Sequence, residues 1–203
     1  MSAQLPTAGC CAGGRLIQMP KADSLTRSIS AAWKGNAMGT IDDLKAAFAG
    51  ESQANRTYLA FAKKADADGL PQVARLFRAA AEAETVHAHA HLNVLGGVKS
   101  TADNLQVAIN GEAHEFESMY PEFVAEAKKE GNKGAVMSFE NALAVEEIHH
   151  GLYNDALKAV SAGKDLPASP IFVCPVCGNT VLGAAPDKCP ICQTPKSKFF
   201  EVK

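Results

Sequence analysis

The sequence has no excess of charge of either sign and no long hydrophobic run. Its 203 residues carry 20 lysines and arginines against 22 acids, so it lacks the basic surface that holds nucleic acid or an anionic membrane. No apolar stretch approaches the roughly 18 residues that a membrane-spanning helix needs, and the first 40 residues lack the apolar segment of a secretory signal. These absences predict a soluble cytoplasmic protein whose partners include neither nucleic acid nor a membrane.

Cysteines are few and unevenly distributed. Four of the six form two Cys-x-x-Cys pairs near the C-terminus, a spacing that binds metal in reducing compartments. The pairs are Cys174 with Cys177, and Cys189 with Cys192. The other two, Cys10 and Cys11, are adjacent, and adjacent cysteines seldom bridge each other. The cysteines therefore indicate a metal site rather than a disulfide framework.

The two C-terminal pairs have the spacing of a metal knuckle. Eleven residues separate them, and Gly178 directly follows the first pair. Each Cys-x-x-Cys turn presents two thiolates to one metal, and the glycine permits the tight backbone that exposes amide groups to sulfur. Tetrahedral thiolate coordination suits zinc or a single iron, and the sequence leaves both open.

Apolar periodicity divides the chain into four helical stretches and a small C-terminal module. Residues 1–39 show no sustained apolar period and predict a disordered extension. The helical stretches run over about 40–69, 71–96, 100–131 and 133–163. A polar linker occupies 164–171, and 172–203 is too short to form a core of its own. The sequence therefore predicts an all-α four-helix bundle over 40–163, followed by a module stapled by metal.

The third helical stretch contains a proline. Ser100, with Asp103 three residues later, marks the start of this stretch, and Pro121 lies inside it. Because the proline ring meets the carbonyl group four residues back, we expect a kink or a local break of the helix at Pro121.

Several acids and histidines occupy helix positions that the apolar period assigns to the core. The second and fourth helices each carry Glu-x-x-His, which places both side chains on one helix face within reach of one metal. The candidate ligands are Glu51, Glu84, His87, Glu112, Glu115, Glu146 and His149. A carboxylate-bridged metal pair takes one glutamate from each of two helices and Glu-x-x-His from each of the other two. The sequence supplies this set and one glutamate more.

The spacing of these acids is nearly repeated. Glu51 and Glu84 are 33 positions apart, and Glu112 and Glu146 are 34 apart. This predicts two similar helical hairpins, related by a pseudo-twofold, around a shared metal pair. Bare carboxylates directed inward would be very costly to bury, so they require cations that neutralise them.

The fourth helix offers a second version of the motif. Glu147 and His150 make Glu-x-x-His one position later, but the face that they share is more polar. We therefore choose Glu146 and His149 as the inward pair.

The remaining histidines and two tyrosines have weaker assignments. His89 and His114 fall off the inner stripes and are expected to face solvent, while His91 is expected to pack beside the site rather than to bind metal. Tyr58 and Tyr120 are close enough to the acids to hydrogen-bond ligands, although a core tyrosine is the default interpretation.

Taken together, these motifs resemble the rubrerythrin family over about residues 38–203. The matching segments are GESQAN around Glu51, AEAETVH ending at His87, GEAHEFESMYP from Gly111, AVEEIHH around Glu146, and the final CPVCG and CPIC. The resemblance implies a ferritin-like bundle with a non-haem di-iron centre, and a rubredoxin-like domain with one iron, or zinc, at four cysteines. It implies that the seven candidate ligands hold the di-iron centre and that the four cysteines hold the single metal.

The resemblance also implies an activity. Members of the family reduce hydrogen peroxide to water with electrons drawn from NAD(P)H through separate reductases and rubredoxin-type carriers. In the family the extra glutamate, here Glu115, exchanges with the histidine, here His87, as one iron changes oxidation state. We expect these two residues and Tyr58 to take part in catalysis. Subunits of the family typically pair head to tail, so a homodimer is expected.

Two other functions remain open from the sequence. A ferroxidase that stores iron would assemble into large cages and load far more than three irons per chain, and a four-cysteine module has no obvious use in storage. A peroxide sensor would show no sustained peroxide consumption with NADH and a reductase. The leading prediction is a peroxidase of oxidative-stress defence.

Overall fold

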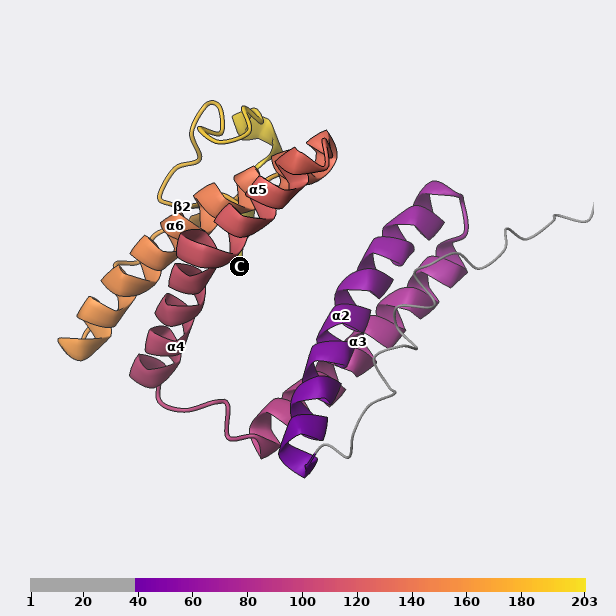
Figure 1. Ribbon diagram of the computed structural model, residues 1–203, viewed down its shortest axis with the longest axis horizontal. Helices are drawn as coiled ribbons and strands as arrows, with labels where there is room; N and C mark the ends of the chain where they lie inside the picture. The colour runs from indigo at the N-terminus through magenta and orange to yellow at the C-terminus, as the bar shows by residue number, and fades with distance from the viewer. Residues whose placement is uncertain (1–38) are drawn as a thin grey trace, which may run out of the picture. The chain divides into compact units, whose positions relative to one another are not determined.

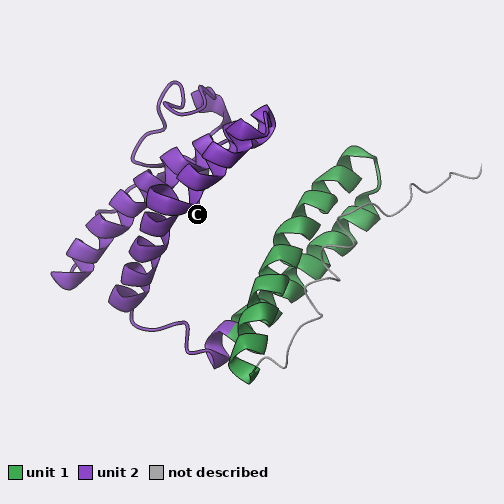
Figure 2. Ribbon diagram, viewed as in Figure 1, with its two compact units in different colours: residues 1–91 green, residues 92–203 purple. Residues whose placement is uncertain are grey.

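The computed structural model describes residues 39–203 and is mostly helical (Figure 1). The predicted disorder of residues 1–39 concerns residues outside this described part, apart from Gly39, which precedes the first described helix. The described chain forms two compact units that meet between His91 and Leu92 (Figure 2). No described helix combines the length and the apolar character needed to cross a membrane.

The first unit is a helical hairpin of α2 (Thr40–Ala67) and α3 (Pro71–Val94, whose last turn crosses into the second unit). Its buried residues are mainly alanines, which lack the bulk that would hold two backbones apart. Ala62, Ala65, Ala74 and Ala81 are all at most 6% exposed. The turn between the helices closes through Gly69, whose φ of +74° is readily adopted only by glycine.

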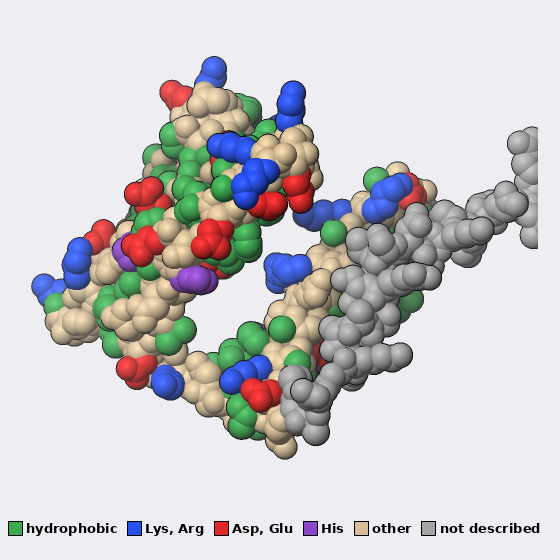
Figure 3. Space-filling model, in the orientation of Figure 1, with side chains coloured by type: hydrophobic (Ala, Val, Ile, Leu, Met, Phe, Trp, Pro, Cys, Tyr) green, Lys and Arg blue, Asp and Glu red, His purple; other side chains and the backbone are tan. Residues whose placement is uncertain are grey.

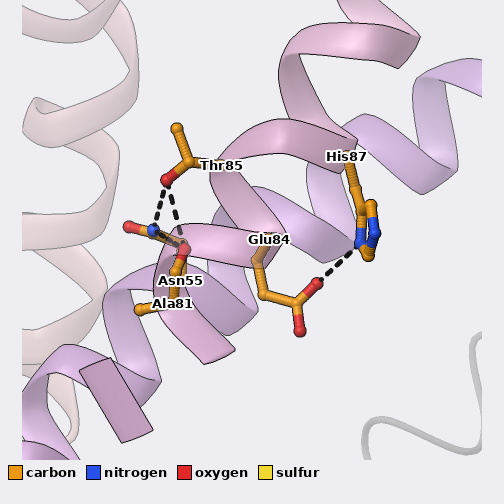
Figure 4. A network of polar contacts seen from close by, with 5 residues as sticks. All are labelled: Asn55, Ala81, Glu84, Thr85 and His87. Atoms are coloured by element: carbon orange, nitrogen blue, oxygen red, sulfur yellow. Dashed lines mark hydrogen bonds and ion pairs between the residues drawn. The ribbon is translucent and has the colours of Figure 1, made fainter. Parts of the chain in front are cut away.

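A buried asparagine connects the two helices of this hairpin (Figure 4). Asn55 of α2 is 7% exposed, and its side-chain amide donates to the Ala81 carbonyl at 2.6 Å and to the Thr85 hydroxyl at 2.8 Å. A buried amide without partners would cost roughly 1–3 kcal/mol, so these bonds fix the register of α2 against α3. That register determines which turns of α2 and α3 are adjacent, and therefore which of their acidic residues come together.

The second unit contains the other hairpin and the C-terminal module. A continuous helical path of α4 (Thr101–His114), the π-helix η1 (Glu115–Met119) and α5 (Tyr120–Lys129) packs against α6 (Lys133–Ser161). Ser100 caps α4 as expected, because its hydroxyl accepts the Asp103 N–H at 3.1 Å. The helical path is not broken at the predicted position, Pro121; the helix type changes just before it, where the π-helix ends at Met119 and α5 begins at Tyr120.

The π-helix accounts for the one-residue difference between the two hairpins. Glu84 and Glu146 are 62 positions apart, as are Tyr58 and Tyr120, but Glu51 is followed by Glu112 after only 61. The extra residue therefore enters the second hairpin between Glu112 and Tyr120, where η1 widens one helical turn. Such π-bulges occur frequently at functional sites.

The hairpins also share an aromatic cluster beside their acids. The first has Tyr58, Phe61 and Phe77, and the second has Tyr120, Phe123 and Phe139. The two phenylalanine rings of each cluster have centroids 5.5 Å apart. Both clusters lie between the acids and the hairpin turn, so the predicted internal repeat extends from the ligands to the packing around them.

The C-terminal module is a three-stranded antiparallel sheet with the order β2-β1-β3. The strands are β1 (Ile171–Val173), β2 (Thr180–Leu182) and β3 (Phe200–Val202), and the short 3-10 helix η2 (Lys196–Lys198) precedes β3. The first cysteine turn lies between β1 and β2, the second lies between β2 and β3, and β2 contacts α6. Three-residue strands bury little apolar surface, so the module depends on what its cysteines bind.

Candidate metal centres

Three side chains converge on one face of the first hairpin, and we call Glu51, Glu84 and His87 the first triad. One ligand atom from each lies within 4.8 Å of the others. His87 Nδ1 is 3.1 Å from Glu84 Oε2 (Figure 4). A hydrogen bond with Glu84, together with partial burial, raises the pKa of the Glu51 carboxyl. The Glu84 side chain is 17% exposed and that of His87 is 56% exposed, so this group is open on one side within its unit.

The second hairpin carries the same arrangement, and we call Glu112, Glu146 and His149 the second triad. Its ligand atoms also lie within 4.8 Å of one another. His149 Nδ1 is 2.9 Å from Glu146 Oε2 and 3.9 Å from Glu112 Oε1. Burial and the neighbouring Glu146 carboxylate raise the pKa of Glu112 to about 7. Carboxylates that resist ionisation in this way are strongly stabilised by a bound cation.

The surplus glutamate lies in the π-helix of the second unit. Glu115 is half-buried, and burial together with the Glu146 carboxylate raises its pKa. Its carboxylate is not among the atoms that converge in the second triad. Glu115 is therefore beside the second triad rather than part of it.

The other sequence assignments can be compared with the structure one by one. The pair Glu146 and His149 converges with Glu112, whereas the ring of His150 packs on Phe116 with centroids 5.3 Å apart. The side chains of His89 and His114 are exposed, as expected, and the side chain of His91 is half-buried. Tyr58 packs in the aromatic cluster of its hairpin.

Burial and the neighbouring acids raise the pKa of two tyrosines in the second unit. Burial, and next the Glu115 carboxylate, raise the pKa of Tyr120, and burial with Glu112 raises the pKa of Tyr153. Both phenols therefore keep their protons at neutral pH and can act only as neutral hydrogen-bond donors or acceptors. Tyr153 packs beside the His149 ring, with ring centroids 6.5 Å apart.

The four C-terminal thiols form one cluster. Cys174 Sγ lies 3.5 Å from Cys192 Sγ, and Cys177 Sγ lies 3.5 Å from Cys189 Sγ. All four are free thiols, and Cys174 and Cys189 are buried. Four sulfurs about 2.3 Å from one tetrahedral metal would be about 3.8 Å apart, so the cluster fits a single zinc or iron.

Hydrogen bonds tune these thiols unequally. Burial raises the pKa of Cys177 well above its usual range. At Cys189 burial is outweighed by the N–H groups of Cys192 and Ile191, which lower its pKa. At Cys192 the hydroxyl and N–H of Thr194 likewise outweigh burial and lower the pKa. Bonds of this kind stabilise thiolates, the form that binds metal.

A hydrogen-bond bridge joins the cysteine module to the second triad inside the second unit. Thr180 Oγ1 lies 2.9 Å from His149 Nε2 and donates to the Gly178 carbonyl at 3.1 Å. Because the hydroxyl donates its hydrogen to that carbonyl, it accepts from His149 Nε2–H, and Nδ1 faces the acids, 2.9 Å from Glu146 Oε2. Gly178 is bonded directly to Cys177 in the chain, so the bridge runs from a cluster cysteine to a triad histidine.

Close packing supports this bridge. Gly178 has a φ of +86°, and a side chain there would meet Val145 of α6 at 3.7 Å. No sequence motif indicated Thr180, because its partner is 31 positions away in another element. Only the packing of β2 on α6 brings the two together.

Bundles that bind two metals between helices take their carboxylates and Glu-x-x-His pairs from two hairpins in this distribution. The molecule is thus a di-iron carboxylate protein of the ferritin-like class, with a rubredoxin-like metal site attached. The family model "Rubrerythrin" matches residues 42–157, and the model of the rubrerythrin rubredoxin-like domain matches residues 172–200. The chain belongs to the rubrerythrin family.

Known proteins similar to the chain carry related names. Rubrerythrin-2 of Clostridium acetobutylicum is 39% identical over 178 residues, which cover 81% of this chain and 96% of the relative. Nigerythrin of Nitratidesulfovibrio vulgaris is 36% identical over 197 residues, which cover 90% and 96% of the two chains. A solved structure of fully reduced, all-ferrous nigerythrin is 35% identical, covers 83% of this chain and 89% of its own, and has a TM-score of 0.49. The cofactors of the family are a non-haem di-iron centre and a rubredoxin-like iron site.

Proposed function

We propose that the chain reduces hydrogen peroxide to water at a di-iron centre held by the two triads and Glu115. The observation that carries this proposal is the duplication of the triad. Two hairpins present the same two carboxylates and one imidazole nitrogen, each set within 4.8 Å. Six donors of this kind suit two irons, and Glu115 provides a seventh donor that only the second hairpin possesses.

The donor sets fit iron in charge as well as in number. Five carboxylates carry a charge of −5, which lies between the +4 of two ferrous ions and the +6 of two ferric ions. A hydrogen bond with Glu84 raises the pKa of Glu51, and burial followed by the neighbouring Glu146 carboxylate raises the pKa of Glu112 and Glu115. When bound, the iron pair supplies the two electrons that reduce peroxide and the Lewis acidity that polarises its oxygens.

The chain's own residues manage protons and geometry around this reaction. Reduction of one peroxide to two water molecules consumes two electrons and two protons. Glu115 can approach or leave the site because it lies beside the second triad, and we assign it an exchange of position with His87. The exposed side of His87 gives that imidazole room to move. Tyr58 lies in the aromatic cluster below the first triad, where its hydroxyl can hydrogen-bond a ligand.

Electrons reach the site through the cysteine module in this proposal. Thr180 connects His149 to the turn that holds Cys177, so the module and the second triad are coupled by two hydrogen bonds and a peptide. We assign iron rather than zinc to the four cysteines, because only iron can pass electrons. The donors to this iron are rubredoxin-type carriers or NAD(P)H-dependent reductases. The protein acts as a homodimer in the cytoplasm, where free thiols stay reduced.

The test is stopped-flow mixing of the fully reduced protein with peroxide and, separately, with oxygen. We expect the di-iron absorption to appear much faster with peroxide than with oxygen. Oxidation that is no faster with peroxide would overturn the peroxidase assignment and favour a ferroxidase. As a matched control, the variant Glu84→Ala/His87→Ala should lose the fast phase while keeping the visible absorption of the cysteine iron.

A further inference from the structure

The two cysteine turns of the C-terminal module share one backbone plan. We call the turn that begins at Cys174 the first turn and the turn that begins at Cys189 the second. The Cys174 N–H donates to the Asn179 carbonyl at 3.0 Å. In the same way, the Cys189 N–H donates to the Thr194 carbonyl at 2.8 Å. Asn179 and Thr194 therefore occupy equivalent positions, and both are buried, at 2% and 9% exposure.

The side chain of Asn179 reaches across the thiol cluster to the other turn. Its amide donates to Cys189 Sγ at 3.7 Å, a hydrogen-bonding distance for an atom as large as sulfur. Its backbone N–H serves the first turn: burial raises the pKa of Cys177, and the Asn179 N–H acts against that rise. Asn179 thus directs one N–H to a sulfur of each turn.

The side chain of Thr194 stays within its own turn. Thr194 Oγ1 lies 3.1 Å from Cys192 Sγ. A thiolate bound to metal can only accept, so the hydroxyl donates to it. Both side-chain donors, Asn179 and Thr194, therefore act on the sulfurs of the second turn. The first of them is the one that links the two turns.

The neighbours of Asn179 in the chain fix its backbone against the bundle. A side chain at Gly178 would meet Val145 of α6 at 3.7 Å, so this turn packs closely on the helix. The Thr180 hydroxyl lies 2.9 Å from His149 Nε2. Asn179 is held between these two contacts, so its amide is already directed at the sulfur and needs no rearrangement when the charge of the metal site changes.

The charged side chains of the module are placed differently from Asn179. Lys188, Lys196 and Lys198 are all exposed, and lysines are in view on the surface of the second unit (Figure 3). Water and salt screen the field of such charges. Asn179 is uncharged but buried in contact with a sulfur, where the field of its N–H dipole is screened much less.

Reduction of an iron held by four thiolates increases the negative charge of the site. One electron from a carrier protein converts ferric to ferrous iron, and the charge of the iron with its thiolates changes from one negative to two negative. Burial opposes this step, because a low dielectric disfavours the more highly charged state, and Cys174 and Cys189 are at most 1% exposed. N–H groups directed at sulfur favour the step and raise the reduction potential.

We propose that Asn179 raises the reduction potential of the cysteine iron through its side-chain hydrogen bond to Cys189 Sγ. This inference rests on the iron that the proposed function assigns to the cysteines, and it names a residue that tunes that iron. Asn179 acts through a ligand sulfur, so it is a positioning residue for electron transfer. Its effect is to let the cysteine iron collect an electron more completely from a given donor. Thr194 acts in the same direction through Cys192.

The test is the variant Asn179→Leu, which keeps a side chain of similar size and removes the donor. The reduction potential is measured by following the visible absorption of the cysteine iron during a redox titration of the whole protein. A hydrogen bond to a charged acceptor is strong enough for its loss to shift this equilibrium about tenfold toward ferric iron. For one electron, that shift lowers the potential by about 59 mV.

The matched control is Gln193→Gly, which also removes an amide side chain from a cysteine turn. Gln193 is exposed, and its φ of +62° is one that glycine adopts readily. The control should keep the wild-type potential. An Asn179→Leu variant with the wild-type potential would overturn the proposal, and so would an equal fall in the control. Purified protein without cysteine-iron absorption would instead refute the iron of the proposed function.

A second measurement uses the wild-type chain and does not depend on how the variant folds. Cadmium-113 replaces iron at the four thiolates, and its nuclear spin couples to hydrogens that donate to its ligand sulfurs. We expect coupling to the side-chain amide of Asn179. The N–H groups of Ile191 and Cys192, which face Cys189 Sγ, provide the internal reference. Coupling to these two groups without coupling to the Asn179 amide would also overturn the proposal.

Discussion

Replacing Thr180 with valine tests whether the cysteine module and the second triad act as one unit. Valine keeps the branched shape that suits β2 but removes the hydroxyl that accepts from His149 Nε2 at 2.9 Å. A net hydrogen bond is worth about 0.5–1.5 kcal/mol, and leaving the ring N–H without a partner at a half-buried site costs about 1–3 kcal/mol. At about 1.4 kcal/mol for each factor of ten, iron affinity at the second triad should fall by roughly tenfold.

The same change should slow electron transfer. Loss of the hydroxyl breaks the bridge from His149 to the Gly178 carbonyl. The cysteine iron should therefore reduce the oxidised di-iron centre at least about tenfold more slowly, because removing the hydrogen-bond partner of a metal-bound histidine commonly costs that much activity. The assay is single-turnover absorption spectroscopy, in which the bleaching and return of the cysteine-iron bands report the transfer.

The control is Thr180→Ser, which restores the hydroxyl without the methyl group. Serine should recover most of the iron affinity and of the transfer rate. A valine variant that behaves like the wild type would refute the bridge. A serine variant as impaired as valine would show that the shape of the side chain matters rather than its hydroxyl.

Three further predictions follow from the site. Glu115→Gln should keep both irons but slow their oxidation by peroxide at least about tenfold. The control Glu117→Gln, at an exposed position of the same π-helix, should change neither the iron content nor the oxidation rate. Equal stopped-flow rates for the two variants would show that Glu115 takes no part in catalysis. In the folded iron-free protein the pKa of Glu112 is raised from 4.5 to about 7. The contribution of Glu112 to the free energy of unfolding should therefore be greatest below pH 4.5 and decline by at most about 3 kcal/mol as the pH rises through about 7. Solvent at the partly open site reduces that figure, and denaturant melts at several pH values should show a flatter profile for Glu112→Gln; an unchanged profile would contradict the assignment. Cys192→Ser should abolish the cysteine-iron absorption and stop sustained peroxide consumption with NADH and a reductase, while pre-reduced protein still reacts once with peroxide; sustained turnover would exclude the module from electron delivery.

Much of the architecture could be predicted because its signals are local. Helical periodicity located all four long helical stretches within a few residues, and the paired Cys-x-x-Cys turns identified the thiol cluster. The choice of Glu146 and His149 over their neighbours depended only on which helix face is more apolar, and this is the pair that converges with Glu112.

Other features depend on contacts that periodicity does not encode. The difference between 33 and 34 positions was visible in the sequence, but only the helix geometry shows that the extra residue widens a turn at Glu115. Thr180 belongs to no motif, since its role arises from the packing of a short strand on α6.

The central claim is that the two triads hold an iron pair that reduces peroxide by two electrons. Anaerobic titration of the fully reduced protein with peroxide tests it most directly, with the di-iron and cysteine-iron bands followed together. We predict that one peroxide oxidises one iron pair, that the cysteine iron then returns one of the two electrons that the pair has lost, and that hydroxyl radicals are not released. Slow oxidation, or one-electron oxidation with radical release, would contradict the claim.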